Sequence, residues 1–509
     1  MLRNLILFLF LLSCFLLTAA GDFDCLDGWV RYKQAQSLVI KSPPDFQEGF
    51  RYTGYHEQDL IRLSQFPNMH WGQVFGFIPL YALGNWLGPG ILHGGHFFST
   101  FLNAFFAAGL CLFFFNLLLL LNYSKKISFT MTFILAFSTM VWVYSKSMHD
   151  AVQEGFFALA TFYFLLKFQK LKLYRYFYIS LMMMILGFIT RYTFVLTLPA
   201  WIFLLIQTKA DVKKVFIYPA FILMPIIIFL FFKLSITWAN FSWWANAYFE
   251  MVSLKPFLNG LRGLLLSPGK SIFIFNPILL LSVFLFPFFY KKFKTEAMTI
   301  FLLSTSYIIF YANVRFFAGD PVWGPRYLLV IIPFCLLFLA ESFNFLNRYI
   351  KYICSILVSI GILFQMVGVL VGYTYYVHMT NYRYDLPQYF YHKLDAVRYY
   401  NDPKLNAIYQ LGKGIPYFLK RMKTFEWRHV SEDSLKKLYA RNTEIIDKTA
   451  LKEVLDKNAD DNIFNLWFVK AIYVYPRERF TFRLILFTFV LGVFSLSAIA
   501  LPYAYRNKG

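Results

Sequence analysis

The sequence has few charged residues and no framework of cysteines. Only 15% of its 509 residues are charged and 59% are hydrophobic, which is far from the average of a soluble domain. Four of the five cysteines lie in apolar runs and only Cys25 lies in a polar stretch, so neither a disulfide framework nor a CxxC metal site is predicted. The chain also has no GxGxxG motif, no P-loop and no internal repeat. With a mean hydropathy of +0.52, these absences indicate an integral membrane protein.

The formal charge of +22 is the one feature that could suggest a nucleic-acid partner. A nucleic-acid binder concentrates its Lys and Arg on one soluble face, whereas here they occur in short clusters between apolar runs. We therefore expect membrane lipids as partners and no nucleic acid.

Apolar runs of roughly 17 to 25 residues can each cross a bilayer. The sequence contains about twelve such candidates, at 4–20, 96–121, 128–143, 153–168, 176–190, 192–207, 215–233, 272–290, 297–312, 327–342, 352–374 and 483–503. The predicted fold is an all-α, polytopic membrane bundle.

Basic residues test the alternation of these spans, because Lys and Arg concentrate in cytoplasmic connections. Every second connection is basic, which places both termini inside. The residues are Lys125 and Lys126; Lys170, Lys172 and Arg175; Lys209, Lys213 and Lys214; Lys291, Lys292 and Lys294; Arg348 and Lys351; Arg506 and Lys508.

The apolar segment 72–88 does not fit this alternation as a span. We predict that it lies flat in the outer interface, within a first outer loop at about 21–95. The start of the chain resembles a signal peptide, but a retained first helix is favoured because the run is long enough to span. The expected organisation is a transmembrane domain over 1–376, an outer helical cap over 377–482, and a last helix with a cytoplasmic tail over 483–509.

Unusual polar sequences all fall on the predicted outer side, at 22–38, 144–154, 266–273 and 319–327. Loops that converge on one face are where a site is expected. In the first, Asp27 and Arg31 are four apart and share a face if the segment is helical. Asp27 is then either an ordinary helix cap or a general base, and Arg31 either its surface partner or a phosphate ligand.

The other patches have similar alternatives. Asp150 and Glu154 are one helical turn apart, and they either solvate the interface or orient an acceptor or a divalent metal, although the spacing matches no specific metal site. Lys270 and Arg326 each follow a Gly/Pro turn, and they either snorkel to headgroups or bind an anion. HGGH at 93–96 is more simply a loop turn than a metal site.

Taken in order, these patches resemble a known family. The chain is similar to bacterial members of the GT-C superfamily of polyprenyl-phosphate-dependent glycosyltransferases, which includes protein O-mannosyltransferases and the lipid A aminoarabinose transferase. The resemblance extends to about residue 376. It is carried by DGWVRYKQAQSL, FPNMHWGQVFGFIPLYALG, LLLSPGKSIFIFNPILLL and GDPVWGPRYLLVIIP.

The resemblance implies roles for individual residues. Asp27 falls on the catalytic base of the first outer loop, and Asp150 or Glu154 on the acidic residue of the second. Relatives carry a Lys or His with prolines before the interfacial helix, and the corresponding residues here lack those prolines. Further residues are implied as donor-phosphate ligands, namely Arg31, Lys270 and Arg326, or as additional site residues, namely His70, Asn68, Asp320 and Tyr327.

The implied reaction is an inverting transfer on the extracytoplasmic face of a bacterial cytoplasmic membrane. A sugar on a polyprenyl-phosphate donor moves to a hydroxyl of a glycan, lipid or protein acceptor. No cofactor is required by this chemistry, and a divalent metal stays an open alternative. The sequence does not identify the sugar, the acceptor or the prenol length.

Two other functions share some of these features. A transporter or flippase for a lipid-linked or anionic substrate also has about twelve spans, but it places charges or helix breaks near mid-span and often shows two related halves. A lipid-linked polysaccharide polymerase or ligase shares the compartment, but it usually lacks an Asp in the first outer loop. The clustering of polar residues on one outer face favours the transferase.

Overall fold

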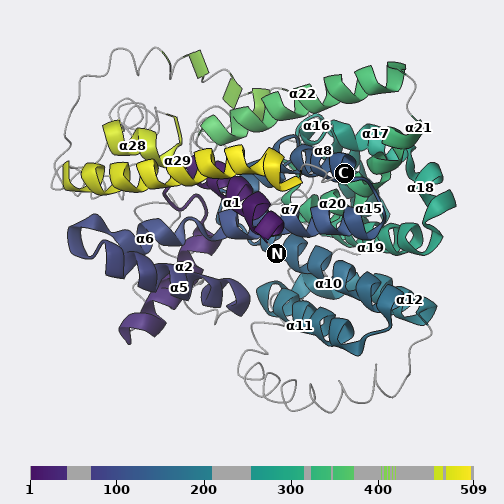
Figure 1. Ribbon diagram of the computed structural model, residues 1–509, viewed down its shortest axis with the longest axis horizontal. Coiled ribbons are helices and arrows are strands. Elements are labelled where there is room, and N and C mark those ends of the chain that lie inside the picture. Colours follow the sequence, from purple (N-terminus) through teal and green to yellow (C-terminus); the bar gives the residue numbers. More distant parts are fainter. Residues whose placement is uncertain are drawn as a thin grey trace.

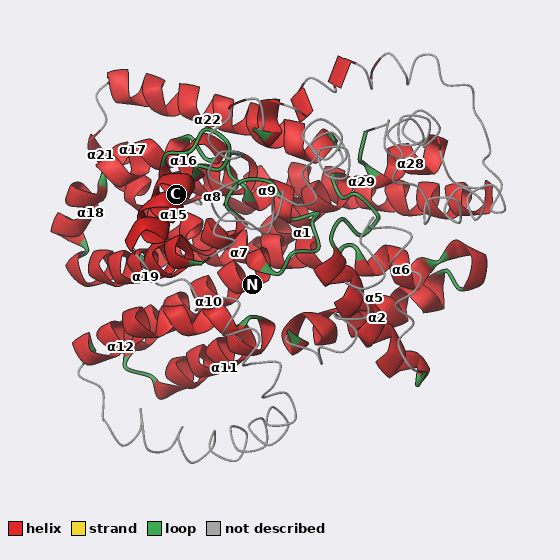
Figure 2. Ribbon diagram, turned by 180° about the vertical axis from the view of Figure 1, so that it is seen from behind, coloured by secondary structure: helices red, strands yellow, loops and turns green. Residues whose placement is uncertain are grey.

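The computed structural model describes residues 2–42, 70–208, 254–314, 322–345, 348–371, 464–473 and 477–505, with isolated residues between 403 and 419. Within these residues all regular structure is helical and there is no strand, as Figures 1 and 2 show. The predicted span 215–233 lies outside the described residues, as does most of the predicted cap 377–482.

Five helical segments are long and apolar enough to cross a membrane. They are Gly94–Leu120, which comprises α6 (Gly94–Ser99) and α7 (Leu102–Leu120), then α10 (Ala151–Leu171), α19 (Lys294–Asn313), α22 (Arg348–Leu370), and the part Arg479–Tyr505 of α29 (Arg477–Tyr505). Shorter apolar helices are α1 (Leu2–Leu17), α11 (Tyr174–Thr190), and η2 (Tyr192–Thr197) joined to α12 (Leu198–Gln207). The all-helical prediction is confirmed for the described residues, and the five candidate spans support the predicted membrane character, whereas the count of about twelve spans stays a prediction.

The remaining helices are shorter or more polar. They are α2 (Leu26–Ile40), α5 (Trp71–Leu87), η1 (Gly90–Leu92), α8 (Lys125–Phe137), α9 (Val141–Tyr144), α15 (Leu254–Leu265), α16 (Ile272–Phe275), α17 (Ile278–Phe284), α18 (Phe286–Lys292), η4 (Arg326–Ile331), α20 (Ile332–Leu336), η5 (Leu337–Glu341), α21 (Ser342–Phe345) and α28 (Trp467–Tyr473). In Figure 1, α2, α5 and α6 form one corner of the molecule, and α10, α11 and α12 form another.

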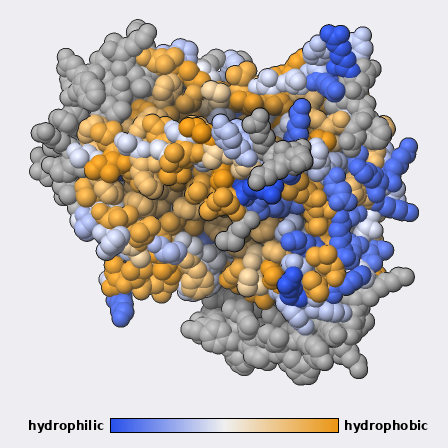
Figure 3. Space-filling view, in the orientation of Figure 1, coloured by the Kyte–Doolittle hydropathy of each residue, from blue (hydrophilic) through white to orange (hydrophobic). Residues whose placement is uncertain are grey.

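Polar contacts at one end of the bundle join connections that lie far apart in the sequence. Tyr123 donates a hydrogen bond to the buried carboxylate of Glu341, which also pairs with Lys292 at 3.0 Å. Tyr505 near the C-terminus donates to the carbonyl of Arg3 at 3.1 Å. In Figure 3 hydrophilic residues gather on the right, where Figure 1 places α12, α18 and α21, and apolar residues cover much of the rest of that face.

The segment 322–342 runs through the centre of the fold, because every one of its residues is buried. It winds as alternating 3-10 and α pieces, namely η4, α20 and η5, with Pro333 in the first turn of α20. The predicted span 327–342 therefore faces protein on all sides. Its N-terminal end carries the GPRY motif of the sequence.

Helices α5 and α6 approach each other closely because glycines lie at their contact. A Cβ atom added at Gly84 would lie 2.2 Å from the carbonyl oxygen of Gly94 and 2.8 Å from Cβ of Phe98. Backbone atoms cannot move aside as a flexible side chain can. Close packing of α5 on α6 therefore requires a glycine at position 84.

We expect Gly84→Ala to destabilise the protein by about 2 kcal/mol, the usual cost of overpacking a close contact. Thermal unfolding in detergent measures the loss. Gly492→Ala is the matched control, since Gly492 is also helical but has no atom within 4 Å of an added Cβ. Equal melting temperatures for both variants would show that the contact of α5 with α6 does not limit stability.

Candidate functional site

Helix α2 carries the first pair of site residues. Sγ of Cys25 caps its N-terminus by accepting from the backbone N–H of Gly28. One turn apart on this helix, the carboxylate of Asp27 lies 4.0 Å from the guanidinium of Arg31. The Asp27 side chain is 45% exposed, whereas that of Arg31 is 12% exposed. Asp27 is thus accessible to solvent, whereas Arg31 is mostly enclosed by protein.

Asp150 is the centre of the buried charges. Its carboxylate accepts hydrogen bonds from Arg31 Nη1 at 3.2 Å and from Arg191 Nη1 at 3.1 Å, and it lies 2.7 Å from Nδ1 of His70. Burial opposes ionisation of this carboxyl, but Arg191 and Arg31 outweigh it and hold the pKa of Asp150 well below its usual value. Three elements, α2, the start of α5 and the α11–η2 junction, therefore meet at one carboxylate.

His70 precedes α5 and contributes a neutral ring. Its Nδ1 lies 2.8 Å from the carbonyl oxygen of Thr190 as well as beside Asp150, so Nδ1 carries the proton. Burial, followed by the nearby Arg31, lowers the pKa of His70. A Cβ added at Gly72 would lie 2.7 Å from Cα of Thr190, which shows how closely α5 packs against the end of α11.

Glu154 lies one turn further along α10 and is fully buried. Its Oε1 accepts hydrogen bonds from Tyr307 at 2.7 Å and Thr193 at 3.0 Å, and its Oε2 lies 3.5 Å from Nε of Arg191. Arg191 therefore bridges Asp150 and Glu154. Glu154 serves as part of this network rather than as an accessible group.

Arg326 lies on the other side of the same region. Its Nη1 donates to the ring of His149, with Nδ1 at 2.5 Å, and its Nη2 donates to the hydroxyl of Tyr327 at 3.3 Å. The guanidinium carbons of Arg191 and Arg326 are each 5.0 Å from the ring centre of Tyr327, whose ring also stacks on Tyr311 at 4.4 Å. Burial and the adjacent Arg326 lower the pKa of His149 well below its usual value.

Lys270 supports the loop that carries Arg326. Its ammonium is buried and donates to the carbonyl oxygens of Val322 and, at 3.2 Å, Gly324. Gly324 has φ +59°, a conformation that side chains disfavour. The structure therefore gives Lys270 a loop-anchoring contact next to the region where Arg326 lies. Two other residues of the predicted site, Asn68 and Asp320, are outside the described part of the chain.

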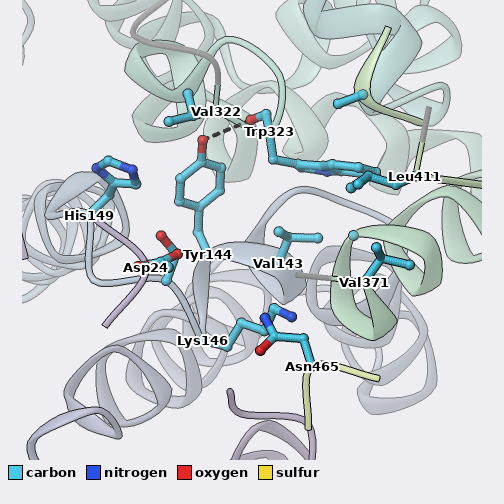
Figure 4. Close-up of a pocket in the computed structure, with 13 residues that line it drawn as sticks. Asp24, Val143, Tyr144, Lys146, His149, Val322, Trp323, Val371, Leu411 and Asn465 are labelled. Carbon is cyan, nitrogen blue, oxygen red and sulfur yellow. Dashed lines mark hydrogen bonds between the residues drawn. The ribbon is translucent and has the colours of Figure 1, made fainter. Parts of the chain in front are cut away.

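A small pocket of about 30 Å³ adjoins the charged region, with room for about one or two water molecules. Figure 4 shows Trp323 and Leu411 on one side of it, and Asp24, Lys146 and Asn465 on the other. Burial raises the pKa of Asp24, which accepts from the backbone N–H of Met148 at 2.8 Å. Burial, with repulsion from Lys470, lowers the pKa of Lys146 to about 7. Since His149 lines this pocket and also contacts Arg326, the pocket and the charged cluster share a wall.

The structure brings together seven predicted residues, and it adds others that the sequence analysis missed. Around Asp150 lie Arg31, His70, Glu154 and, on the exposed side, Asp27; Arg326 and Tyr327 join them because Arg191 contacts the ring of Tyr327. Arg191 was missed, although a lone arginine between two apolar runs is a signal in a membrane protein. Gln73 and Tyr307 were also missed, because isolated polar residues occur in many apolar helices and nothing in the sequence distinguishes these two from the rest.

The region does not fit a metal ion. Among the described residues, no group of three His, Cys, Asp or Glu side chains is arranged to hold one. The carboxylates of Asp150 and Glu154 face guanidinium, imidazole and hydroxyl groups, which occupy the oxygens that a metal would need. No step of the chemistry below is therefore assigned to a metal.

Comparison with known proteins gives no further assignment. No family model matches the chain, and searches of curated proteins and of solved structures find no significant match.

We expect Asp150→Asn to destabilise the protein by about 3 to 5 kcal/mol at neutral pH, because it leaves two buried guanidinium groups without their shared carboxylate. The folded-state pKa is depressed, so the stabilisation is fully present above the unfolded value of about 4 and is lost as the pH falls through the folded value. The difference in unfolding free energy between wild type and variant should be flat from about pH 5 to 8 and shrink in more acidic solution.

Asp22→Asn is the control for this measurement. Asp22 pairs with Lys470 at 2.7 Å, but its side chain is 38% exposed, so its loss should cost no more than about 1 kcal/mol. Similar losses for the two variants would mean that Asp150 is not the centre on which the buried network depends.

Proposed function

We propose that the protein is a membrane glycosyltransferase that moves a sugar from a polyprenyl-phosphate carrier to an acceptor hydroxyl. The single observation that supports this most is the arrangement of Asp27: a half-exposed carboxylate 4.0 Å from Arg31, whose own guanidinium is fixed in the buried cluster. A solvent-accessible base beside a preorganised cation is what an attack by a hydroxyl on a phosphate-linked sugar requires.

Asp27 suits the role of general base better than Asp150. A base must be able to receive a proton from the acceptor, so its oxygens must be within reach of that acceptor. Asp150 is 9% exposed and is engaged by Arg31, Arg191 and His70, whereas Asp27 is 45% exposed. In the proposed reaction Asp27 takes the proton of the acceptor hydroxyl as its oxygen attacks the anomeric carbon, with inversion, and the lipid phosphate leaves.

In the proposed reaction three arginines bind the leaving phosphate. Arg31, Arg191 and Arg326 come from three different elements and lie around the same buried region. Guanidinium groups bind phosphate oxygens through paired N–H groups, and such contacts are strongest where water is excluded. Tyr327 lies within 5.0 Å of two of the guanidinium carbons, and so it helps to fix their separation.

The positions of these charges favour an enzyme over a transporter. Arg191 lies between α11 and η2, Asp150 immediately before α10, and Arg326 at the start of η4. These are helix ends rather than the middles of spans, where a transporter places its substrate and ion sites. We place the site on the extracytoplasmic face of the cytoplasmic membrane, and assign as acceptor a glycan, lipid or protein hydroxyl.

We expect Asp27→Asn to reduce transfer by at least about a hundredfold, because the amide has nearly the same size but cannot accept the proton. Transfer is measured from radiolabelled polyprenyl-phosphate sugars to cell-envelope acceptors in membranes containing the protein. Asp22→Asn is the matched control, since Asp22 is an acid of comparable exposure in the same loop. Near-normal turnover by Asp27→Asn would show that Asp27 is not the base and would favour the transporter as the function.

The proposed sidedness has a separate test. We expect Lys125→Cys, at the start of α8, to react with a membrane-impermeant maleimide only after permeabilisation, and Lys41→Cys, exposed after α2, to react in intact cells. The native cysteines are buried or partly buried, which keeps the background low. Labelling of Lys125→Cys from the outside would reverse the proposed orientation.

A further inference from the structure

Helix α5 has two apolar faces with different surroundings. Phe75, Leu83 and Trp86 are exposed on one face, with Trp86 77% exposed, and their spacing is that of one side of a helix. The opposite face packs on α2 and α6. On that packed face lies Gln73, an amide with no exposed surface in a segment that is otherwise almost entirely apolar.

Both ends of the Gln73 amide are used. Its Oε1 accepts a hydrogen bond from Arg31 Nη1 at 2.5 Å, and its Nε2 donates to the carbonyl oxygen of Met148 at 2.8 Å. Arg31 Nη1 also donates to Asp150, two residues beyond Met148. Gln73 therefore ties the guanidinium of Arg31 to the turn that carries Asp150.

A neutral amide at this point has a chemical consequence. A hydrogen bond from a buried guanidinium to an amide oxygen fixes its orientation but leaves its charge in place. A glutamate has nearly the same shape and would form a stronger, charge-assisted bond, but it would cancel that charge. Two carboxylates contact Arg31: Asp150, which is shared with Arg191 and His70, and the half-exposed Asp27 at 4.0 Å. Gln73 makes a shorter contact than either, and it does so without adding a third negative charge.

We propose that Gln73 is a positioning residue of an anion site: it orients Arg31 toward the phosphate of a polyprenyl-phosphate lipid while leaving the charge of Arg31 available to that phosphate. The inference rests on the proposed function, because it takes the lipid phosphate as the ligand of Arg31. It adds a residue from the apolar helix α5, and it gives this helix a role in donor binding.

The experiment measures binding to the purified full chain in nanodiscs. The probe is undecaprenyl phosphate, and undecaprenol and inorganic phosphate serve as comparison ligands that carry only the tail or only the anion. Two variants are compared with wild type. Gln73→Met keeps the length of the side chain and removes both hydrogen bonds. Gln73→Glu keeps the acceptor for Arg31, adds a negative charge and loses the donor to the Met148 carbonyl.

We expect wild type to bind undecaprenyl phosphate more tightly than undecaprenol or inorganic phosphate, and both variants to bind it about tenfold more weakly. Their melting temperatures should differ, because Gln73→Glu keeps a partner for Arg31 and loses only the donor to the Met148 carbonyl, whereas Gln73→Met loses both hydrogen bonds. If the ligand did not use the charge of Arg31, Gln73→Glu, which keeps an acceptor for Arg31, would retain wild-type affinity.

A double-mutant cycle with Arg31→Met tests whether Gln73 acts through Arg31. If it does, Gln73→Met has no further effect on affinity once Arg31 is replaced. If Gln73→Met still lowers the affinity about tenfold in the Arg31→Met background, the proposal is overturned. It is also overturned if the wild type binds the lipid phosphate and either Gln73→Glu or Gln73→Met binds it equally well.

Failure of the proposed function gives a different result. If wild-type protein binds undecaprenyl phosphate no better than undecaprenol, the lipid-phosphate site itself is wrong, and both proposals fall. If inorganic phosphate binds as tightly as the lipid, the site recognises a free anion, and the lipid assignment is overturned. The positioning role is supported if the wild type binds undecaprenyl phosphate more tightly than undecaprenol and both variants bind undecaprenyl phosphate more weakly than the wild type.

Discussion

A single buried carboxylate, that of Asp150, determines how helix α2 meets the rest of the protein. Asp150 can stay ionised in a buried position only because cations surround it, and those cations come from separate parts of the chain: Arg31 from α2 and Arg191 from the α11–η2 junction. Each segment would leave an uncompensated charge if it moved away. The electrostatic cost of separation thus holds α2 and the α11–η2 junction together.

The backbone around Asp150 is itself held by amide side chains. Asn103 on α7 donates to the carbonyl oxygens of Ser147 and, at 2.7 Å, His149, while Gln73 donates to that of Met148. Three successive carbonyl groups of a short turn are therefore satisfied by neutral donors from two helices. This leaves the charged groups free to interact with one another, and it sets His149 and Asp150 facing in different directions, one toward Arg326 and one toward Arg31.

The helical membrane character could be predicted from hydropathy, because long apolar runs have few alternatives in a bilayer. The sequence also indicated Asp27 with Arg31 and Asp150 with Glu154, since four-residue spacing is visible without a structure. It could not show that Lys270 binds loop carbonyls, or that Arg191 joins Asp150 to Glu154, because those contacts depend on tertiary packing. Nor could it show that 327–342 faces protein on every side, since a buried rod and a lipid-facing span have the same apolar composition.

The 3-10 winding of the central segment affects how far it reaches. A 3-10 helix rises about 2.0 Å per residue against about 1.5 Å in an α-helix, so the six residues of η4 and the five of η5 lengthen the rod by about 5 Å. Glu341 is anchored at one end by Lys292 and Tyr123, and Arg326 lies at the other. The segment therefore sets the distance between Glu341 and Arg326, and removing one residue from a 3-10 piece would shorten this distance by about 2 Å.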